Sequence, residues 1–258
     1  MLDMRLIGKE KLILIPILKD NYAYLIAWDH SALIVDPGEG SPELAVIEKE
    51  KLELKYILAT HHHKDHIGGA QLLQEKTDCA LIAPDDPQIS QVDRIASDGE
   101  ELILGPFSIQ VVATPGHTKS HVVYYFSEQK VLFSGDLLFA GGCGYLYEGT
   151  SQEMWHSLQK LFQFPDDTEI YCGHEYTERN LEFAAHIEPT NRRVAERLKK
   201  VKALRSQGKP TIPSTLGEET MTNPFLRVTE KELQQAVGMN GADPEAVFAA
   251  IREKKNHF

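Results

Sequence analysis

Residues 60–66 read THHHKDH, and this stretch decides how the rest of the chain is interpreted. Its members His61, His63, Asp65 and His66 are spaced as metal ligands. A single open catalytic ion takes about three protein ligands and keeps one position free. Four candidates within six residues therefore indicate two ions side by side, and a pair of ions indicates hydrolysis.

The surrounding sequence places this run at the end of a strand. An apolar segment at residues 56–59 precedes it, and Gly68 and Gly69 follow it. Open α/β folds form their sites at the carboxyl ends of strands. Other predicted strands end in further candidates, which completes a set of seven: His61, His63, Asp65, His66, His117, Asp136 and His174. If one carboxylate bridges, each of two ions has three ligands of its own.

The ligand types limit the chemistry. A mixture of imidazole and carboxylate suits zinc, iron or manganese, and the sequence does not choose among them. A water between two such ions becomes hydroxide at neutral pH, so it attacks an acyl carbonyl without a serine or cysteine nucleophile. We therefore expect Cys143 and Cys172 to be structural, and His62 and Lys64 to turn away into solvent.

Composition disfavours several classes of protein. The net charge of −11 over 258 residues lacks the basic balance of nucleic-acid enzymes. The apolar run at residues 12–18 is too short to span a membrane. Three widely spaced cysteines form no CxxC pair and fit a reducing compartment. We expect a cytoplasmic monomer that binds neither nucleic acid nor membrane.

Hydrophobic periodicity divides the chain near residue 175. Residues 1–175 alternate short strands with helices, which predicts an α/β domain of two mixed sheets with outer helices. One of these helices is expected to begin with Ser41 as its N-cap. Residues 176–258 predict a small all-helical domain, in which residues 210–224 form an irregular connector. No role is evident for the first eight residues.

The ligand run, taken with His117, Asp136 and His174, resembles the metallo-β-lactamase superfamily, whose fold is an αββα sandwich. The turn at residues 36–38 resembles that superfamily's strand-end aspartate. A closer resemblance, over essentially the whole chain, is to glyoxalase II, the hydroxyacylglutathione hydrolases. It is carried by residues 19–22, 142–144, 147–150, 171–176, 213–216, 223–225 and 252–258.

This resemblance implies an activity and a ligand assignment. The first ion would be held by His61, His63 and His117, and the second by Asp65, His66 and His174, with Asp136 as the bridge. Asp65 and Asp136 would be the catalytic carboxylates. The family hydrolyses S-D-lactoylglutathione to D-lactate and glutathione, the second step of methylglyoxal detoxification. Two divalent ions are implied, with zinc first and iron or manganese as alternatives.

The resemblance also implies substrate contacts. Tyr147 and Tyr176 match positions that touch glutathione, and Arg252 and Lys255 match the cations that bind its glycine carboxylate. These two cations stand three residues apart, on one face of the last predicted helix. The family has lysine or arginine where this chain has Tyr145, which implies weaker glutathione binding or a shifted preference.

Other functions fit the sequence less well. A glutathione-persulfide dioxygenase with one iron shares the first domain but lacks the long helical domain, so residues 177–258 argue against it. The acidic charge disfavours a nuclease, and the lack of a signal peptide disfavours a β-lactamase. A non-catalytic metal-binding protein need not keep all seven ligands.

Overall fold

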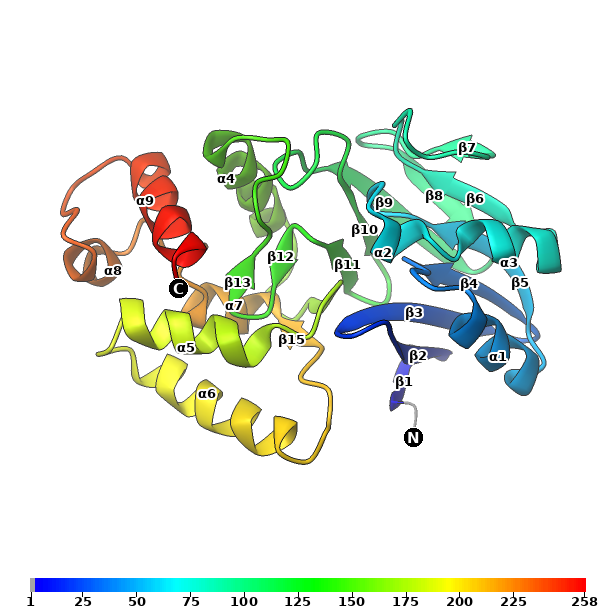
Figure 1. Cartoon of the computed structure of the whole chain (residues 1–258), viewed down its shortest axis with the longest axis horizontal. Helices are drawn as coiled ribbons and strands as arrows, with labels where there is room; N and C mark the ends of the chain where they lie inside the picture. Colours follow the sequence, from blue (N-terminus) through cyan, green and yellow to red (C-terminus); the bar gives the residue numbers. More distant parts are fainter. Residues whose placement is uncertain (1–2) are drawn as a thin grey trace. The chain divides into compact units, whose positions relative to one another are not determined.

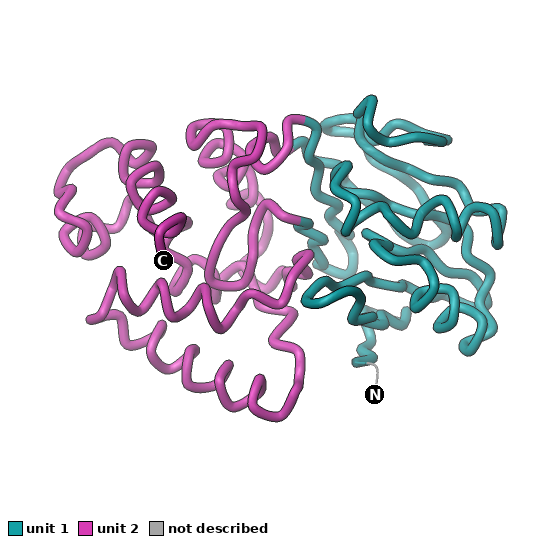
Figure 2. Tube along the Cα trace, viewed as in Figure 1, with its two compact units in different colours: residues 1–113, 120–135 teal, residues 114–119, 136–258 magenta. Residues whose placement is uncertain are grey.

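The computed structural model describes residues 3–258, and the chain divides into two compact units. Unit 1 comprises residues 1–113 and 120–135, and unit 2 comprises residues 114–119 and 136–258 (Figure 2). The chain therefore passes between the units at three peptide bonds, and each unit is described by itself below.

The first sheet of unit 1 is mixed, as the sequence predicts. Its strands lie in chain order: β1 (Asp3–Ile7), β2 (Glu10–Ile17), β3 (Asn21–Trp28), β4 (Ser31–Val35), β5 (Glu53–Leu58), β6 (Ala80–Ala83) and β7 (Arg94–Ile95). Strands β1 to β4 pair antiparallel, and β4 to β7 pair parallel. The parallel pairing puts the carboxyl ends of β4 and β5 at the same edge of the sheet.

Of the first eight residues, for which the sequence suggested no role, residues 1–2 lie outside the described part of the chain and Asp3–Ile7 form the edge strand β1. Asp3 to Ile7 pair with Leu14 to Glu10 of β2. Most of β1 is exposed, and Leu6 alone keeps 75% of its surface accessible. Met4 and Leu6 alternate with Asp3 and Arg5, but both apolar side chains are exposed and only Ile7 is buried, so the strand has no buried face of its own.

Two helices cover the outer face of the first sheet (Figure 1). Helix α1 (Ser41–Glu50) contributes Val46 and Ile47 to the core, and α3 (Ala70–Thr77) contributes Leu73. These side chains pack with Ile13 of β2 and Ile57 of β5. Burial of this apolar layer is the main favourable term for such an arrangement.

The predicted N-cap of α1 is wrong by one residue. The cap is Gly40, which has φ of 92°, and Ser41 is the first helical residue. The carboxylate of Glu43 accepts hydrogen bonds from the backbone N–H of Gly40 at 2.7 Å and of Glu39 at 3.1 Å. A side chain from inside the helix thus satisfies the free donors, and Ser41 is not needed as a cap.

The second sheet of unit 1 contains β8 (Glu101–Leu104), β9 (Phe107–Ala113), β10 (Val122–Phe126) and β11 (Val131–Gly135), paired antiparallel in that order. All of β10 is buried. The hydroxyl of Tyr124 donates to the carbonyl of Ala59 at 2.8 Å, and the ring of Phe133 lies 5.3 Å from that of Tyr24. The two sheets therefore share an aromatic core.

Unit 2 is mainly helical. Its elements are β12 (Leu138–Phe139), β13 (Gly142–Cys143), α4 (Ser151–Gln159), the 3-10 helix η1 (Lys160–Gln163), β14 (Glu169–Cys172), α5 (Thr177–Ile187), α6 (Arg192–Arg205), β15 (Ser214–Thr215), α7 (Leu216–Thr222), α8 (Lys231–Ala236) and α9 (Pro244–Asn256). The prediction of an irregular connector at residues 210–224 is wrong, because β15 pairs with β14 and Thr215 caps α7 at the N–H of Glu218.

Candidate metal centre

The ligand run follows the carboxyl end of β5, and the turn of residues 36–40 follows the carboxyl end of β4. Because β4 and β5 pair in parallel, these two loops lie beside each other in unit 1. The N–H of Asp36 donates to the carbonyl of Leu58 at 3.0 Å. The loops then meet backbone to backbone, because a Cβ placed on Gly38 would collide with the carbonyl of Asp65. Glycine is required there, and it brings the run close to Asp36. Helix α2 (Lys64–Ile67) carries the end of the run.

Asp36 orients two of the candidate ligands. Its carboxylate accepts hydrogen bonds from the N–H of Thr60 at 2.8 Å, the hydroxyl of Thr60 at 2.8 Å and Nδ1 of His66 at 2.9 Å. The same hydroxyl lies 3.0 Å from Nδ1 of His61. When Nδ1 of a histidine donates to such a partner, its Nε2 keeps the lone pair that a metal ion needs.

The spacing of the ligand atoms in unit 1 fits a divalent ion. Nε2 of His61 lies 3.1 Å from Nδ1 of His63, and Nε2 of His66 lies 3.8 Å from Oδ2 of Asp65. Two ligands that each stand about 2.0–2.2 Å from a tetrahedral zinc are separated by roughly 3.3 Å. Asn21 also donates to Oδ2 of Asp65 at 2.9 Å, which orients that carboxylate.

Unit 2 brings the other three candidates together. Oδ2 of Asp136 lies 3.4 Å from Nε2 of His117 and 3.3 Å from Nε2 of His174. Nδ1 of His117 is 2.8 Å from the carbonyl of Tyr145, to which it donates, so its Nε2 also points to the carboxylate. All three candidates are buried. One oxygen of Asp136 therefore lies close to the Nε2 atoms of both histidines.

A glycine permits the close packing around His117. A Cβ on Gly144 would collide with the carbonyl of Asp136 and lie 3.1 Å from Nδ1 of His117. The glycine-rich sequence at residues 141–144 therefore lets the β12–β13 hairpin approach the ligands of unit 2.

His62 does not turn into solvent, and that expectation is wrong. Its side chain is 8% exposed, and its Nδ1 lies 2.9 Å from Oδ2 of Asp86. Lys64 is exposed, as expected. No local pattern marks Asp86 as a partner, because it lies 24 residues further along the chain.

The three predicted substrate tyrosines lie beside the ligands of unit 2. The ring of Tyr176 stacks on that of His174, with centroids 4.6 Å apart and planes 6° apart. The ring of Tyr147 meets that of His117 edge-on at 5.3 Å, and it lies 5.0 Å from the ring of Tyr145. Tyr145 and Tyr147 are 49% and 66% exposed. Two of these rings therefore face solvent and are accessible to a ligand.

Arg252 of α9 reaches the glycine-rich loop rather than solvent. Its Nη1 donates to the carbonyls of Cys143 at 3.1 Å and Gly144 at 3.2 Å. The residue is 7% exposed, and its guanidinium lies over the ring of Phe225 at 5.3 Å. Arg252 thus ties α9 to the loop, a role that sequence reasoning missed because the partner atoms belong to the backbone.

Lys255 is more accessible than Arg252. Its Nζ lies 3.4 Å from the carbonyl of Arg179 and 4.9 Å from the centroid of the Phe183 ring. Burial, reinforced by the positive charges of Arg179 and Arg252, lowers its pKa to about 8. Its ammonium is therefore charged at pH 7 and loses its proton in the mildly alkaline range.

Cys143 and Cys172 do not act as nucleophiles. Burial raises the pKa of Cys172 to about 12, and it also raises the pKa of Cys143 although Arg252 opposes that shift. The thiolate is the reactive form, so neither thiol attacks a carbonyl at neutral pH. The expectation that both are structural agrees with their environment.

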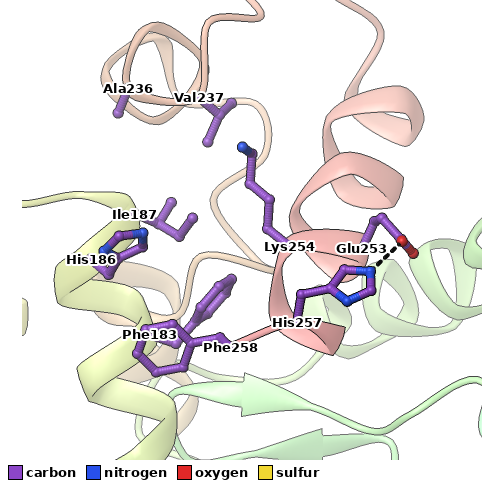
Figure 3. A pocket seen from close by; sticks show the side chains of 9 residues that line it. All are labelled: Phe183, His186, Ile187, Ala236, Val237, Glu253, Lys254, His257 and Phe258. Carbon is purple, nitrogen blue, oxygen red and sulfur yellow. Dashed lines mark hydrogen bonds and ion pairs between the residues drawn. The ribbon is translucent and has the colours of Figure 1, made fainter.

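A separate hollow of about 430 Å³ lies in unit 2 (Figure 3). Its lining residues come from α5, the end of α8 and α9: Phe183, His186, Ile187, Ala236, Val237, Glu253, Lys254, His257 and Phe258. None of the seven candidate ligands lines it. The side chain of Lys254 extends into this hollow (Figure 3).

Comparison with known proteins identifies the family. Residues 18–174 match the metallo-beta-lactamase superfamily, and residues 175–258 match the hydroxyacylglutathione hydrolase C-terminus. The hydroxyacylglutathione hydrolase of Rhodospirillum rubrum is 43% identical over 248 residues, covering 95% of this chain and 97% of the relative. The chain belongs to the hydroxyacylglutathione hydrolase family. The Methylobacillus flagellatus member is 45% identical over 249 residues, covering 95% of this chain and 99% of its own length.

Solved structures agree on the fold of this family member. The crystal structure of ETHE1 from Myxococcus xanthus has a TM-score of 0.66 at 23% identity and covers 99% of this chain and 98% of its own. TTHA1623, solved in a di-iron-bound form, has a TM-score of 0.61 at 26% identity and covers 82% and 98%. The predicted αββα fold with a helical C-terminal domain is confirmed, as is the predicted class of thioester hydrolase.

Membership in this family, together with the histidine and aspartate clusters, implies divalent metal ions. Within residues 3–258, no helix is both long and apolar enough to cross a bilayer.

Proposed function

We propose that this chain hydrolyses S-D-lactoylglutathione and related S-2-hydroxyacylglutathione thioesters to the hydroxy acid and glutathione, using two divalent metal ions. In a cell this would be the second step of methylglyoxal detoxification. The observation that carries the proposal is the set of seven histidine and aspartate ligands in a chain that is 43–45% identical to hydroxyacylglutathione hydrolases over 95% of its length.

The proposed ligand assignment gives the first ion to His61, His63 and His117, the second to Asp65, His66 and His174, and the bridge to Asp136. Ligand spacing within each unit supports it. Chain connectivity supports it too. Gly135 packs so tightly against Thr60 that a Cβ there would lie 2.5 Å from the threonine hydroxyl oxygen. Thr60 immediately precedes His61, and Asp136 immediately follows Gly135.

When bound, the ions would acidify a water molecule and polarise the thioester carbonyl. The protein's own contribution is to hold the ligands before substrate arrives. Asp36 and the carbonyl of Tyr145 fix the ring orientation of His66 and His117. Asp65, whose carboxylate accepts a hydrogen bond from Asn21, would take the proton of the attacking water. The water oxygen bonds to the acyl carbon, the C–S bond breaks, and glutathione leaves as a thiolate.

We propose that residues 1–175 form the catalytic domain and that residues 176–258 form the domain that binds glutathione. Tyr145, Tyr147 and Tyr176 would contact the glutathione moiety, and Arg252 and Lys255 would bind its glycine carboxylate. Because Arg252 already donates to two backbone carbonyls, Lys255 is the more available cation. Tyr145 offers a hydroxyl and an aromatic face in place of a charge, which predicts weaker glutathione binding than a cation would give.

Replacing Lys255 tests this substrate contact. We expect Lys255→Met to raise KM for S-D-lactoylglutathione about 10-fold with little change in kcat, because the lost charge-assisted hydrogen bond is remote from the thioester. In the unmodified protein KM should also rise between pH 7 and pH 9 as Lys255, with its pKa near 8, loses its charge.

The control for this test is Lys254→Met, which removes the neighbouring exposed lysine. Steady-state kinetics from pH 6.5 to 9 should leave this control like the parent and should make KM of Lys255→Met high and independent of pH. Equal KM values for the two variants at pH 7 would place the carboxylate elsewhere.

Removal of the metal tests the activity itself. We propose zinc as the metal, with iron or manganese as alternatives. We expect a chelator to lower S-D-lactoylglutathione hydrolysis about 100-fold or more and added Zn²⁺ to restore it, since both water activation and carbonyl polarisation would be lost. Thioester absorbance and elemental analysis should be measured on the same sample. Unaltered turnover in a metal-free sample would contradict a metal-dependent hydrolase.

The alternative function is a glutathione-persulfide dioxygenase with one iron. The match of residues 175–258 to the hydroxyacylglutathione hydrolase C-terminus favours the hydrolase. Oxygen uptake with glutathione persulfide, measured with an oxygen electrode, distinguishes the two activities.

We further propose that the protein acts in the cytoplasm as a monomer, without nucleic-acid or membrane partners. The three cysteines, which are buried and form no disulfide within residues 3–258, support a reducing compartment.

A further inference from the structure

His62 stands between two candidate ligands in the sequence, yet both of its ring nitrogens have partners on another loop, the one between β6 and β7. Nδ1 lies 2.9 Å from Oδ2 of Asp86, and Nε2 lies 3.1 Å from Nε2 of Gln88. A neutral imidazole donates through one nitrogen and accepts through the other. Donation from Nδ1 to Asp86 and acceptance at Nε2 from Gln88 satisfies both contacts. The ring is therefore held at two points.

Asp86 is the centre of this arrangement. The hydroxyl of Ser120 also donates to its Oδ2, and the backbone N–H of Gln88 donates to its Oδ1 at 2.8 Å. The Asp86 side chain is only 6% exposed. Burial would raise the pKa of this carboxyl, but the hydrogen bonds from Ser120, Gln88 and His62 hold it below its usual value. Asp86 is thus an ionised acceptor for several donors at neutral pH.

The side chains that donate to Asp86 come from the segments that carry candidate metal ligands. His62 lies between His61 and His63, and Ser120 follows His117 by three residues. We propose that Asp86 is a positioning residue that, through His62 and Ser120, holds the two loops carrying the ligands of the first ion. This rests on the ligand assignment of the proposed function.

If Asp86 has this role, its removal should weaken the binding of the first ion and not that of the second. Asp86 binds the residue between two ligands of the first ion, but no contact connects it to Asp65, His66 or His174 among the interactions described for residues 3–258. Residues that orient metal ligands typically contribute 10–100-fold to metal affinity. Because Asp86 acts through His62, we expect the lower end of that range, about 10-fold, for one ion only.

The experiment compares Asp86→Ala with Asp85→Ala. Asp85 is its exposed neighbour, so this control removes the same charge from the same loop. The metal-free proteins are titrated with Co²⁺, and its visible absorption is followed. The parent and Asp85→Ala should bind both ions alike, whereas Asp86→Ala should bind one ion about 10-fold more weakly and the other normally. The kcat of Asp86→Ala should fall in proportion to the fraction of protein that has lost the weakly bound ion, and its KM for the thioester should be unchanged.

Two further variants separate positioning from folding. Asp86→Asn keeps an acceptor oxygen for His62 and should recover part of the affinity, and Ser120→Ala should lose less than Asp86→Ala. Equal Co²⁺ affinities in Asp86→Ala and Asp85→Ala overturn the proposal, as does an equal loss for both ions in Asp86→Asn. A parent protein that binds only one Co²⁺ contradicts the two-ion function instead. The comparison of the two alanine variants still decides whether Asp86 positions that ion's ligands.

Discussion

Asp136→Ala is expected to lower kcat/KM for S-D-lactoylglutathione about 1000-fold and to leave fewer than two ions bound per chain. Oδ2 of Asp136 lies within 3.4 Å of Nε2 of His117 and 3.3 Å of Nε2 of His174. Removing it leaves two buried imidazoles without the anion that the bridge supplies. Loss of one preorganised electrostatic group in an active site typically costs 100- to 1000-fold, and loss of an ion adds to that.

Asp136→Asn and Glu128→Ala complete this experiment. Asparagine keeps the shape and one oxygen but not the charge, so it should retain more metal than alanine does. Glu128 is exposed in the turn between β10 and β11, and its replacement should change neither metal content nor rate. Steady-state kinetics and elemental analysis are measured on each protein. Two bound ions with normal turnover in Asp136→Ala would falsify the bridging role.

The site residues that could be predicted from the sequence are those that lie close together in the chain or directly follow a strand. His61, His63, Asp65 and His66 lie within six residues after a strand, so the chain itself holds them near one another. Asp136 follows β11 in the same way. For such residues, prediction of the strand is enough to predict where the side chain lies.

The parts that could not be predicted depend on distant residues. Asp86 meets His62 across 24 positions and Ser120 across 34. Neither pair has a local spacing rule. The same holds for β15, whose two residues form a strand only because β14 is there to pair with them. A helix as short as α7 is not stable in isolation, so its sequence carries a weak signal.

Unit 2 contains a buried ion pair that is also hidden in the sequence. Nη2 of Arg197 in α6 lies 2.6 Å from Oε1 of Glu219 in α7. Oε2 of Glu219 accepts from the N–H of Gly141 at 2.8 Å and from Nδ2 of Asn223 at 3.0 Å. Nδ2 of Asn223 also donates to the carbonyl of Gly142 at 2.9 Å. This network therefore holds the β12–β13 hairpin on which the packing around His117 depends.

Arg197→Leu is expected to lower the free energy of unfolding by about 3–5 kcal/mol, the usual cost of removing one partner of a buried ion pair. Burial opposes the charge on Arg197, but the carboxylate of Glu219 raises the pKa of Arg197 above its usual value. Without the guanidinium, Glu219, whose side chain is fully buried, would keep an uncompensated charge. Urea denaturation followed by circular dichroism measures the loss.

Two comparisons make this prediction specific to the pair. Lys200→Leu changes an exposed cation of the same helix and should alter the free energy of unfolding by less than about 0.5 kcal/mol. The double variant Arg197→Leu, Glu219→Gln removes the stranded charge while keeping an oxygen for Gly141, so it should be more stable than Arg197→Leu alone. If the double variant is less stable than the single one, the cost lies in the packing of Arg197 and not in the buried charge of Glu219.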